Sequence, residues 1–198
     1  MTPTLSPVVA VCVGHSRFIA GRPEGGALTC APVTSEWDFN DPLARLIAAI
    51  LHDTYGVAAL VVNRYAGSGY AASMRWLADT LREAQAALAV ELHFNSADTP
   101  AAGGHEWLHW HSSSRGLGLA RALETSMSIA FPAMRRRGVK AIGPRDRGAA
   151  FLNLTHCPAA ICEPFFGSSP EDCAAVRGRP EHLAAAIATA LAAVAKNL

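Results

Sequence analysis

The chain has 198 residues, of which 51% are hydrophobic and 17% are charged, and its formal net charge is +1. This length allows one domain with a sizeable core and is short for two, so we expect a single domain over residues 1–198. The near-neutral charge argues against a protein that binds nucleic acid or an anionic membrane surface.

The cysteines and the first residues bear on where the protein is made. Five cysteines form no CxxC pair, which favours a reducing compartment over a disulfide scaffold. Residues 1–7 lack the basic and apolar segments of a signal peptide, and no apolar run is long enough to span a membrane. We therefore expect synthesis in the cytoplasm without a signal peptide or membrane anchor, so that any role outside the cell requires another route out.

Apolar runs alternate with segments of helical periodicity along the chain. Strands are expected at residues 7–13, 57–62, 88–94, 105–111 and 159–163. Helices are expected at residues 37–53, 70–89, 117–134 and 180–195, with a short helix or turn at 149–154. Ser35 is a candidate N-cap for the first helix, although Pro42 favours a start nearer Asp38. The segments 17–34 and 135–147 are expected to be loops.

This alternation predicts an α/β domain with a mostly parallel, twisted sheet of five or six strands and helices on both faces. In such sheets ligands bind beyond the carboxyl ends of the strands. His15, His93 and Glu163 all lie at such ends. The sequence therefore predicts a functional site at this edge.

Histidine and glutamate side chains at this edge could together hold a catalytic zinc ion. A catalytic zinc takes three protein ligands and keeps a fourth position open for water. His15, His93 and Glu36, at a helix start, would supply such a set, and Glu163 would then act as general base. Each residue alone also fits a structural role, since a carboxylate in a first helical turn is favoured by the helix dipole. Four of them at one edge favour a site.

Four short stretches together resemble a known family. They are Gly14-His15 with Gly26-Ala27, then Ser35-Glu36, then Leu92-His93-Phe94-Asn95-Ser96-Ala97, and finally Ile161-Cys162-Glu163-Pro164-Phe165-Phe166. In this order they resemble the zinc-dependent N-acetylmuramoyl-L-alanine amidases of the Amidase_3 type, over about residues 8–172.

The resemblance implies a role for each of the four residues. It makes His15, Glu36 and His93 ligands of Zn²⁺ and Glu163 the catalytic carboxylate. The implied reaction is hydrolysis of the amide between N-acetylmuramic acid and L-alanine in peptidoglycan, by zinc-activated water with Glu163 as base. Peptidoglycan is then the partner, and nucleic acid is not.

The resemblance also suggests which residues lie beside the substrate, and the sequence differs from the family pattern in one stretch. Asn95 and Arg147 are expected to face the substrate. The stretch between His15 and Glu36 is long, so Glu24 competes with Glu36 as the acidic ligand; the helix start favours Glu36. The absence of a wall-binding module or signal peptide suggests a compact phage or prophage lysin.

Other interpretations stay open. His105, Trp107, His109 and His111 share one face of a strand, which favours a half-exposed face over a second metal site; if that face borders the cleft, Trp107 would stack on a sugar. A thiol hydrolase using Cys157 beside His156 is a weaker alternative. A catalytically silent peptidoglycan-binding protein of the same fold is the alternative from a different class.

Overall fold

The computed structural model describes residues 7–19 and 22–198. Its main sheet has the strand order β4-β1-β5-β8-β6-β7. The strands are β1 (Val8–Val13), β4 (Ala59–Val62), β5 (Ala86–Leu92), β6 (His105–Trp110), β7 (Arg136–Ile142) and β8 (Ala159–Glu163). Residues 1–6, over which we expected no signal peptide, lie outside the described residues.

Most neighbouring strands are parallel. β1 pairs in parallel with β4 and β5, and β5 pairs in parallel with β8. β6 runs antiparallel to β8 and parallel to β7, so this pair of strands has the opposite direction to the other four. The predicted mostly parallel α/β sheet is confirmed. One consequence matters for the site: the amino end of β6 lies beside the carboxyl end of β8, with Glu106 opposite Glu163.

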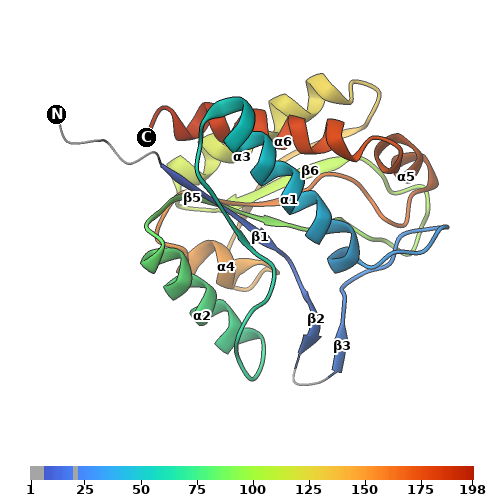
Figure 1. The fold of residues 1–198 in the computed structure, drawn as a ribbon. Coiled ribbons are helices and arrows are strands. Elements are labelled where there is room, and N and C mark those ends of the chain that lie inside the picture. Colours follow the sequence, from blue (N-terminus) through green and yellow to red (C-terminus); the bar gives the residue numbers. More distant parts are fainter. Residues whose placement is uncertain (1–6, 20–21) are drawn as a thin grey trace.

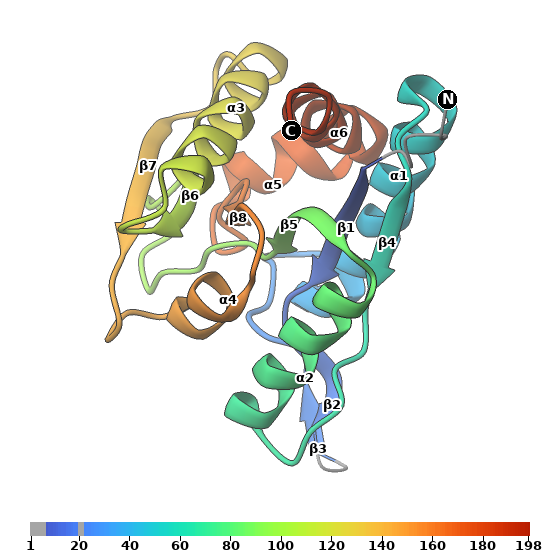
Figure 2. The same ribbon diagram turned by 90° about the vertical axis from the view of Figure 1, so that its left-hand side faces the viewer.

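Helices cover both faces of the sheet (Figures 1 and 2). α1 (Glu36–Tyr55), α3 (Ser114–Ala130) and α6 (Pro180–Ala195) pack over one face, and α2 (Tyr70–Glu83) and α4 (Ala149–Leu154) lie over the other. The central strands β1, β5 and β8 are mostly apolar on both sides, since helices cover both faces of the sheet, and each face has its own core. No helix within residues 7–19 and 22–198 is long and apolar enough to cross a membrane.

The first helix begins where its capping residue predicts. The Ser35 side chain accepts a hydrogen bond from the backbone N–H of Asp38, which makes Ser35 the N-cap and Glu36 the first helical residue. Pro42 is accommodated inside this helix instead of delaying its start. The helix ends at Tyr55 and is capped by Gly56, whose φ of 64° is the left-handed conformation that glycine adopts without strain.

Two segments predicted as loops contain strands. The expected loop 17–34 includes a small antiparallel hairpin, β2 (Ser16–Ile19) with β3 (Arg22–Glu24). The expected basic loop 135–147 includes β7, an edge strand with many exposed or half-exposed residues. This strand was not predicted because its arginines and lysine interrupt any apolar run. An edge strand can carry such residues, since their charged side chains stay in water.

Two helix predictions needed correction at their ends, and one helix was missed. α2 ends at Glu83 and not at residue 89, because Gln85 adopts a φ of 53° that breaks the helix before β5. α3 spans 114–130 and not 117–134, since Pro132 disfavours a helical conformation at Phe131. The short α5 (Pro170–Arg177), capped by Ser169, was not predicted.

The histidine-rich face of β6 was also predicted wrongly. His105, Trp107 and His109 are buried, and of that face only His111, just beyond the strand, is exposed. Trp107 is fully buried in the core beneath α3 and α6, and its indole N–H donates to Nδ1 of His105 at 2.9 Å. Burial, together with the charge of Arg136, lowers the pKa of His105 to about 4. The face therefore belongs to the core, and Trp107 does not border a cleft.

Candidate active site

Four predicted site residues converge at one edge of the sheet. His15 follows β1, His93 follows β5, Glu36 is the first residue of α1, and Glu163 is the last residue of β8. The backbone N–H of His93 donates to the carbonyl of Cys162 at 3.0 Å, which fixes the end of β5 beside the end of β8. His15 has a φ of 64°, an uncommon conformation for a residue with a side chain and one that is enriched at functional sites.

Glu36 lies between the two imidazoles. Its Oε2 is 3.3 Å from Nε2 of His15, and its Oε1 is 3.0 Å from Nδ1 of His93. One donor atom from each of the three residues lies within 4.8 Å of the others, a spacing that suits a metal ion. The carboxylate also accepts backbone N–H groups from Ala27 at 2.8 Å and Phe94 at 3.1 Å. These bonds hold it in place although only 4% of Glu36 is exposed.

Two glycines make room for this arrangement. A Cβ at Gly14 would overlap the imidazole ring of His93, so the ring lies directly against the Gly14 backbone. Gly26 has a φ of 78°, and a Cβ there would lie 2.6 Å from both Glu36 Oε2 and His15 Cδ2. Both positions need the absence of a side chain for the histidines and Glu36 to meet.

The ion pairs shift the protonation of all three residues. Burial alone would lower the pKa of both histidines, but contact with the Glu36 carboxylate raises the pKa of His15 and raises that of His93 well above its ordinary value. For Glu36, burial acts to raise the pKa, and the hydrogen bonds from His15 and His93 outweigh it and lower the pKa to about 2. The cluster therefore favours an ionised carboxylate beside two basic imidazoles.

Glu163 differs from Glu36 in its protonation. Burial raises the pKa of Glu163 to about 8; the positive charge of His93 opposes this, and the neighbouring carboxylates of Glu36 and Glu106 add to it. Its Oε2 is buried and has no hydrogen-bond partner among the described residues. A buried, unpartnered carboxylate oxygen is costly unless a ligand or a proton satisfies it.

Each candidate histidine ligand has a second carboxylate on its other ring nitrogen. Glu24 Oε1 is 2.6 Å from Nδ1 of His15, and Glu91 Oε2 is 3.3 Å from Nε2 of His93. Glu24 thus contacts the His15 nitrogen that does not face Glu36, and it is not part of the close cluster of His15, Glu36 and His93. This geometry favours Glu36 over Glu24 as the acidic ligand.

The two expected substrate-facing residues have different surroundings. Asn95 is half-buried, and its Nδ2 donates to Glu106 Oε1 at 2.8 Å, while Arg137 Nε donates to Glu106 Oε2 at 2.7 Å. Arg147 is exposed and makes no ion pair within the described part of the chain. It precedes Gly148, where a Cβ would overlap Ile161 of β8. The contact of Arg147 and Asn95 with a substrate stays a prediction.

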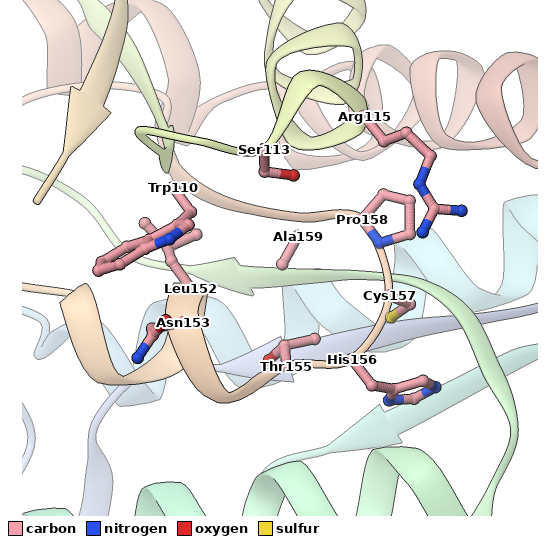
Figure 3. A pocket seen from close by; sticks show the side chains of 10 residues that line it. All are labelled: Trp110, Ser113, Arg115, Leu152, Asn153, Thr155, His156, Cys157, Pro158 and Ala159. Carbon is pink, nitrogen blue, oxygen red and sulfur yellow. The ribbon is translucent and has the colours of Figure 1, made fainter.

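Cys157 lies away from this edge. It precedes β8, whereas Glu163 ends it, and six residues of extended chain span about 20 Å. Cys157 lines a cavity of about 240 Å³ to which none of His15, Glu36, His93 and Glu163 contributes. Figure 3 shows Cys157 there together with Ser113 and Arg115. Burial raises the pKa of the Cys157 thiol to about 11, so the reactive thiolate is scarce at neutral pH. The cavity does not bring Cys157 to the histidine cluster.

Sequence reasoning missed the carboxylates that contact Nε2 of His93 and the Asn95 amide. Glu91 and Glu106 are carboxylates within strands, and both are buried. Their signal in the sequence is a charged residue in an otherwise apolar run. Tyr65 gives no such signal, yet its hydroxyl donates to Glu91 Oε1 at 3.1 Å, and burial raises its pKa well above the ordinary value.

Comparison with known proteins identifies the class. A family model described as N-acetylmuramoyl-L-alanine amidase, Amidase_3, matches residues 9–193. The chain therefore belongs to the Amidase_3 family of N-acetylmuramoyl-L-alanine amidases, as its short motifs predicted. No curated protein matches the chain.

Solved structures share the fold over nearly the whole chain. The amidase AmiC2 of Nostoc punctiforme is 19% identical with a TM-score of 0.74, covering 94% of this chain and 96% of that one. The CwlD amidase from Clostridioides difficile, in complex with the GerS lipoprotein, is 16% identical with a TM-score of 0.80, covering 97% and 100%. The catalytic domain of the CD27L endolysin is 20% identical with a TM-score of 0.74, covering 96% and 97%. At these identities the likeness shows the fold.

Proposed function

We propose that the protein is a zinc-dependent amidase that cleaves the bond between N-acetylmuramic acid and L-alanine in peptidoglycan. The observation that supports this most directly is the position of the Glu36 carboxylate, between Nε2 of His15 and Nδ1 of His93. Membership of the amidase family supports the substrate class. Zinc and the roles of the individual residues are our proposal.

The residues fit a zinc ion. Two imidazoles and one carboxylate from His15, His93 and Glu36 are a common ligand set for catalytic zinc, which keeps a further position for water or substrate. Oε2 of Glu163 is buried and has no hydrogen-bond partner among the described residues, so it is available to a bound group. The surrounding carboxylates would also attract a divalent cation. The donor types and the local charge therefore both suit Zn²⁺.

In the proposed mechanism Glu163 is the proton carrier. A zinc ion held by the three ligands would polarise the amide carbonyl and lower the pKa of water. Glu163 accepts a proton from the attacking water as the oxygen bonds to the carbonyl carbon. It then delivers this proton to the nitrogen of L-alanine, so that the carbon–nitrogen bond breaks and the amine leaves. The products are a free lactyl carboxylate on the glycan and a free amino terminus on the peptide.

Asn95 and Arg147 are the residues that we propose to contact the muramyl peptide. The Asn95 side chain is held by Glu106 close to the end of β5, where its amide is preorganised to bind a polar group. Arg147 is exposed, and its guanidinium can bind a carboxylate of the peptide. The substrate is a wall polymer, which the protein meets after release or export.

The test combines zinc content with digestion of purified peptidoglycan. The wild-type protein should contain about one zinc per chain, lose activity to a chelator and regain it with zinc. Glu163→Gln should keep the zinc and lose about 10²- to 10⁴-fold in rate, because it removes a general base. His93→Ala should lose zinc. A wild-type protein that binds peptidoglycan without releasing peptides would instead be a silent wall-binding protein, and loss of zinc in Glu163→Gln would make Glu163 a ligand.

A further inference from the structure

Glu91 is a buried carboxylate that has no role in the proposed reaction. It lies in β5, two residues before His93, and is only 4% exposed. Its neighbours in register are Cys12 of β1 and Ile161 of β8, so neither adjacent strand places a charged side chain directly opposite it. Burial of a carboxylate here costs free energy unless specific partners stabilise it. The partners that it has therefore indicate its role.

Those partners are a phenol and an imidazole. The Tyr65 hydroxyl donates to Glu91 Oε1 at 3.1 Å, and Glu91 Oε2 is 3.3 Å from Nε2 of His93. One carboxylate oxygen thus anchors Glu91 to the loop after β4, and the other faces the ring of His93. Because the anchor comes from a different strand connection, Glu91 is fixed independently of the histidine that it contacts.

The two nitrogens of His93 consequently face different carboxylates. Nδ1 is 3.0 Å from Oε1 of Glu36, and Nε2 faces Glu91. If the neutral imidazole carries its hydrogen on Nε2 and donates a hydrogen bond from it to Glu91, then Nδ1, which faces Glu36, is unprotonated. His15 shows the mirror arrangement, with Nδ1 on Glu24 and Nε2 toward Glu36. Each ring therefore turns one nitrogen to the shared Glu36 and the other to a carboxylate of its own.

We propose that Glu91 is a positioning residue that, anchored by Tyr65, holds His93 with Nδ1 as its metal-binding nitrogen. This inference rests on the proposed zinc site. Carboxylates that accept the second N–H of a ligating histidine fix its tautomer and raise its basicity, and their loss usually weakens metal binding about 10- to 100-fold. Gly14 completes the arrangement, because the ring of His93 lies against its backbone and cannot turn freely.

The experiment measures zinc affinity of the full chain by competition with a chromophoric chelator. Glu91→Gln should weaken the zinc Kd about 10- to 100-fold. Tyr65→Phe should weaken it less, because the carboxylate stays but loses its anchor. Glu106→Gln is the matched control, because it also neutralises a buried carboxylate. Glu106 lies on β6 and contacts Asn95, Arg137 and Lys140 instead of a histidine. The control variant should leave the Kd close to that of the wild type.

A second readout identifies the coordinating nitrogen. Long-range ¹H–¹⁵N correlation spectra of histidine-labelled, zinc-loaded protein should show zinc on Nδ1 of His93 and a protected proton on Nε2. In Glu91→Gln this proton should exchange faster. Zinc on Nε2 would overturn the inference, as would equal zinc affinity of Glu91→Gln and the wild type. If Glu91→Gln fails to fold, Tyr65→Phe tests the inference instead. An unchanged zinc Kd together with an unchanged exchange rate of the Nε2 proton in Tyr65→Phe would also overturn the inference.

These outcomes separate this inference from the proposed function. A wild-type protein that binds zinc and cleaves the amide, with Glu91→Gln unchanged in affinity, would remove only the role of Glu91. A wild-type protein without zinc affinity would remove the proposed zinc site itself, and the role of Glu91 with it.

Discussion

In the metal-free protein, replacing Glu163 with glutamine should increase stability at alkaline pH relative to the wild type. Burial raises the pKa of Glu163 to about 8, from an ordinary value of 4.5. The folded protein therefore keeps a proton that the unfolded chain releases. The contribution to stability is fully present below pH 4.5 and is lost as the pH rises to about 8.

The size of this effect follows from the same values. The two pKa values are about 3.5 pH units apart, and each unit corresponds to about 1.4 kcal/mol, so the loss reaches at most about 5 kcal/mol. The amide that Glu163→Gln introduces does not titrate, so the advantage of the variant should grow from pH 5 to pH 9. The ion pairs of His15 and His93 with Glu36 titrate in both proteins and largely cancel in the comparison.

Urea unfolding in the presence of a chelator, at pH 5, 7 and 9, measures the difference. A difference between variant and wild type that does not change with pH would refute the buried, protonated state of Glu163. In zinc-loaded protein the pH dependence should become smaller, because a nearby cation favours the ionised carboxylate.

Three further predictions concern other parts of the molecule. Gly14→Ala should lower zinc affinity, because the added Cβ would displace the ring of His93; zinc competition measures it, and an unchanged Kd would contradict the packing. Cys157→Ser should keep the rate of peptidoglycan hydrolysis, whereas loss of activity with zinc retained would revive a thiol mechanism. Trp107→Phe should lower the free energy of unfolding by about 1–3 kcal/mol, since it leaves His105 Nδ1 unpartnered in the core. Its KM for peptidoglycan should stay the same, and an increase would return Trp107 to the substrate cleft.

Much of the fold was predictable because the strands are buried on both faces. β1, β4, β5 and β8 are apolar runs, and strands covered on both sides have this pattern. β7 escaped detection because it lies at the edge and keeps charged side chains in water. The hairpin of β2 and β3 escaped because two short strands between glycines and prolines give no periodic signal.

The edge at which the candidate site lies was also predictable, and its inner contacts were not. A polar residue at the end of an apolar strand is visible in one sequence, which is how His15, His93 and Glu163 were found. The pairing of Glu91 with Tyr65 and His93 depends on which segments meet in space, and a sequence alone does not give that. The face of β6 was predicted to be half-exposed because histidines and a tryptophan alternate along it. The sequence alone does not show that a layer of helices buries this face.

The central claim is that the chain cleaves the amide between the glycan and the stem peptide. Mass analysis of the products from digested, purified peptidoglycan tests it most directly, with Glu163→Gln as the inactive control. The proposed function predicts free stem peptides that begin with L-alanine, together with uncut glycan strands that carry free lactyl groups. Disaccharide peptides, peptides cut within the stem, or the same product pattern from Glu163→Gln would contradict it.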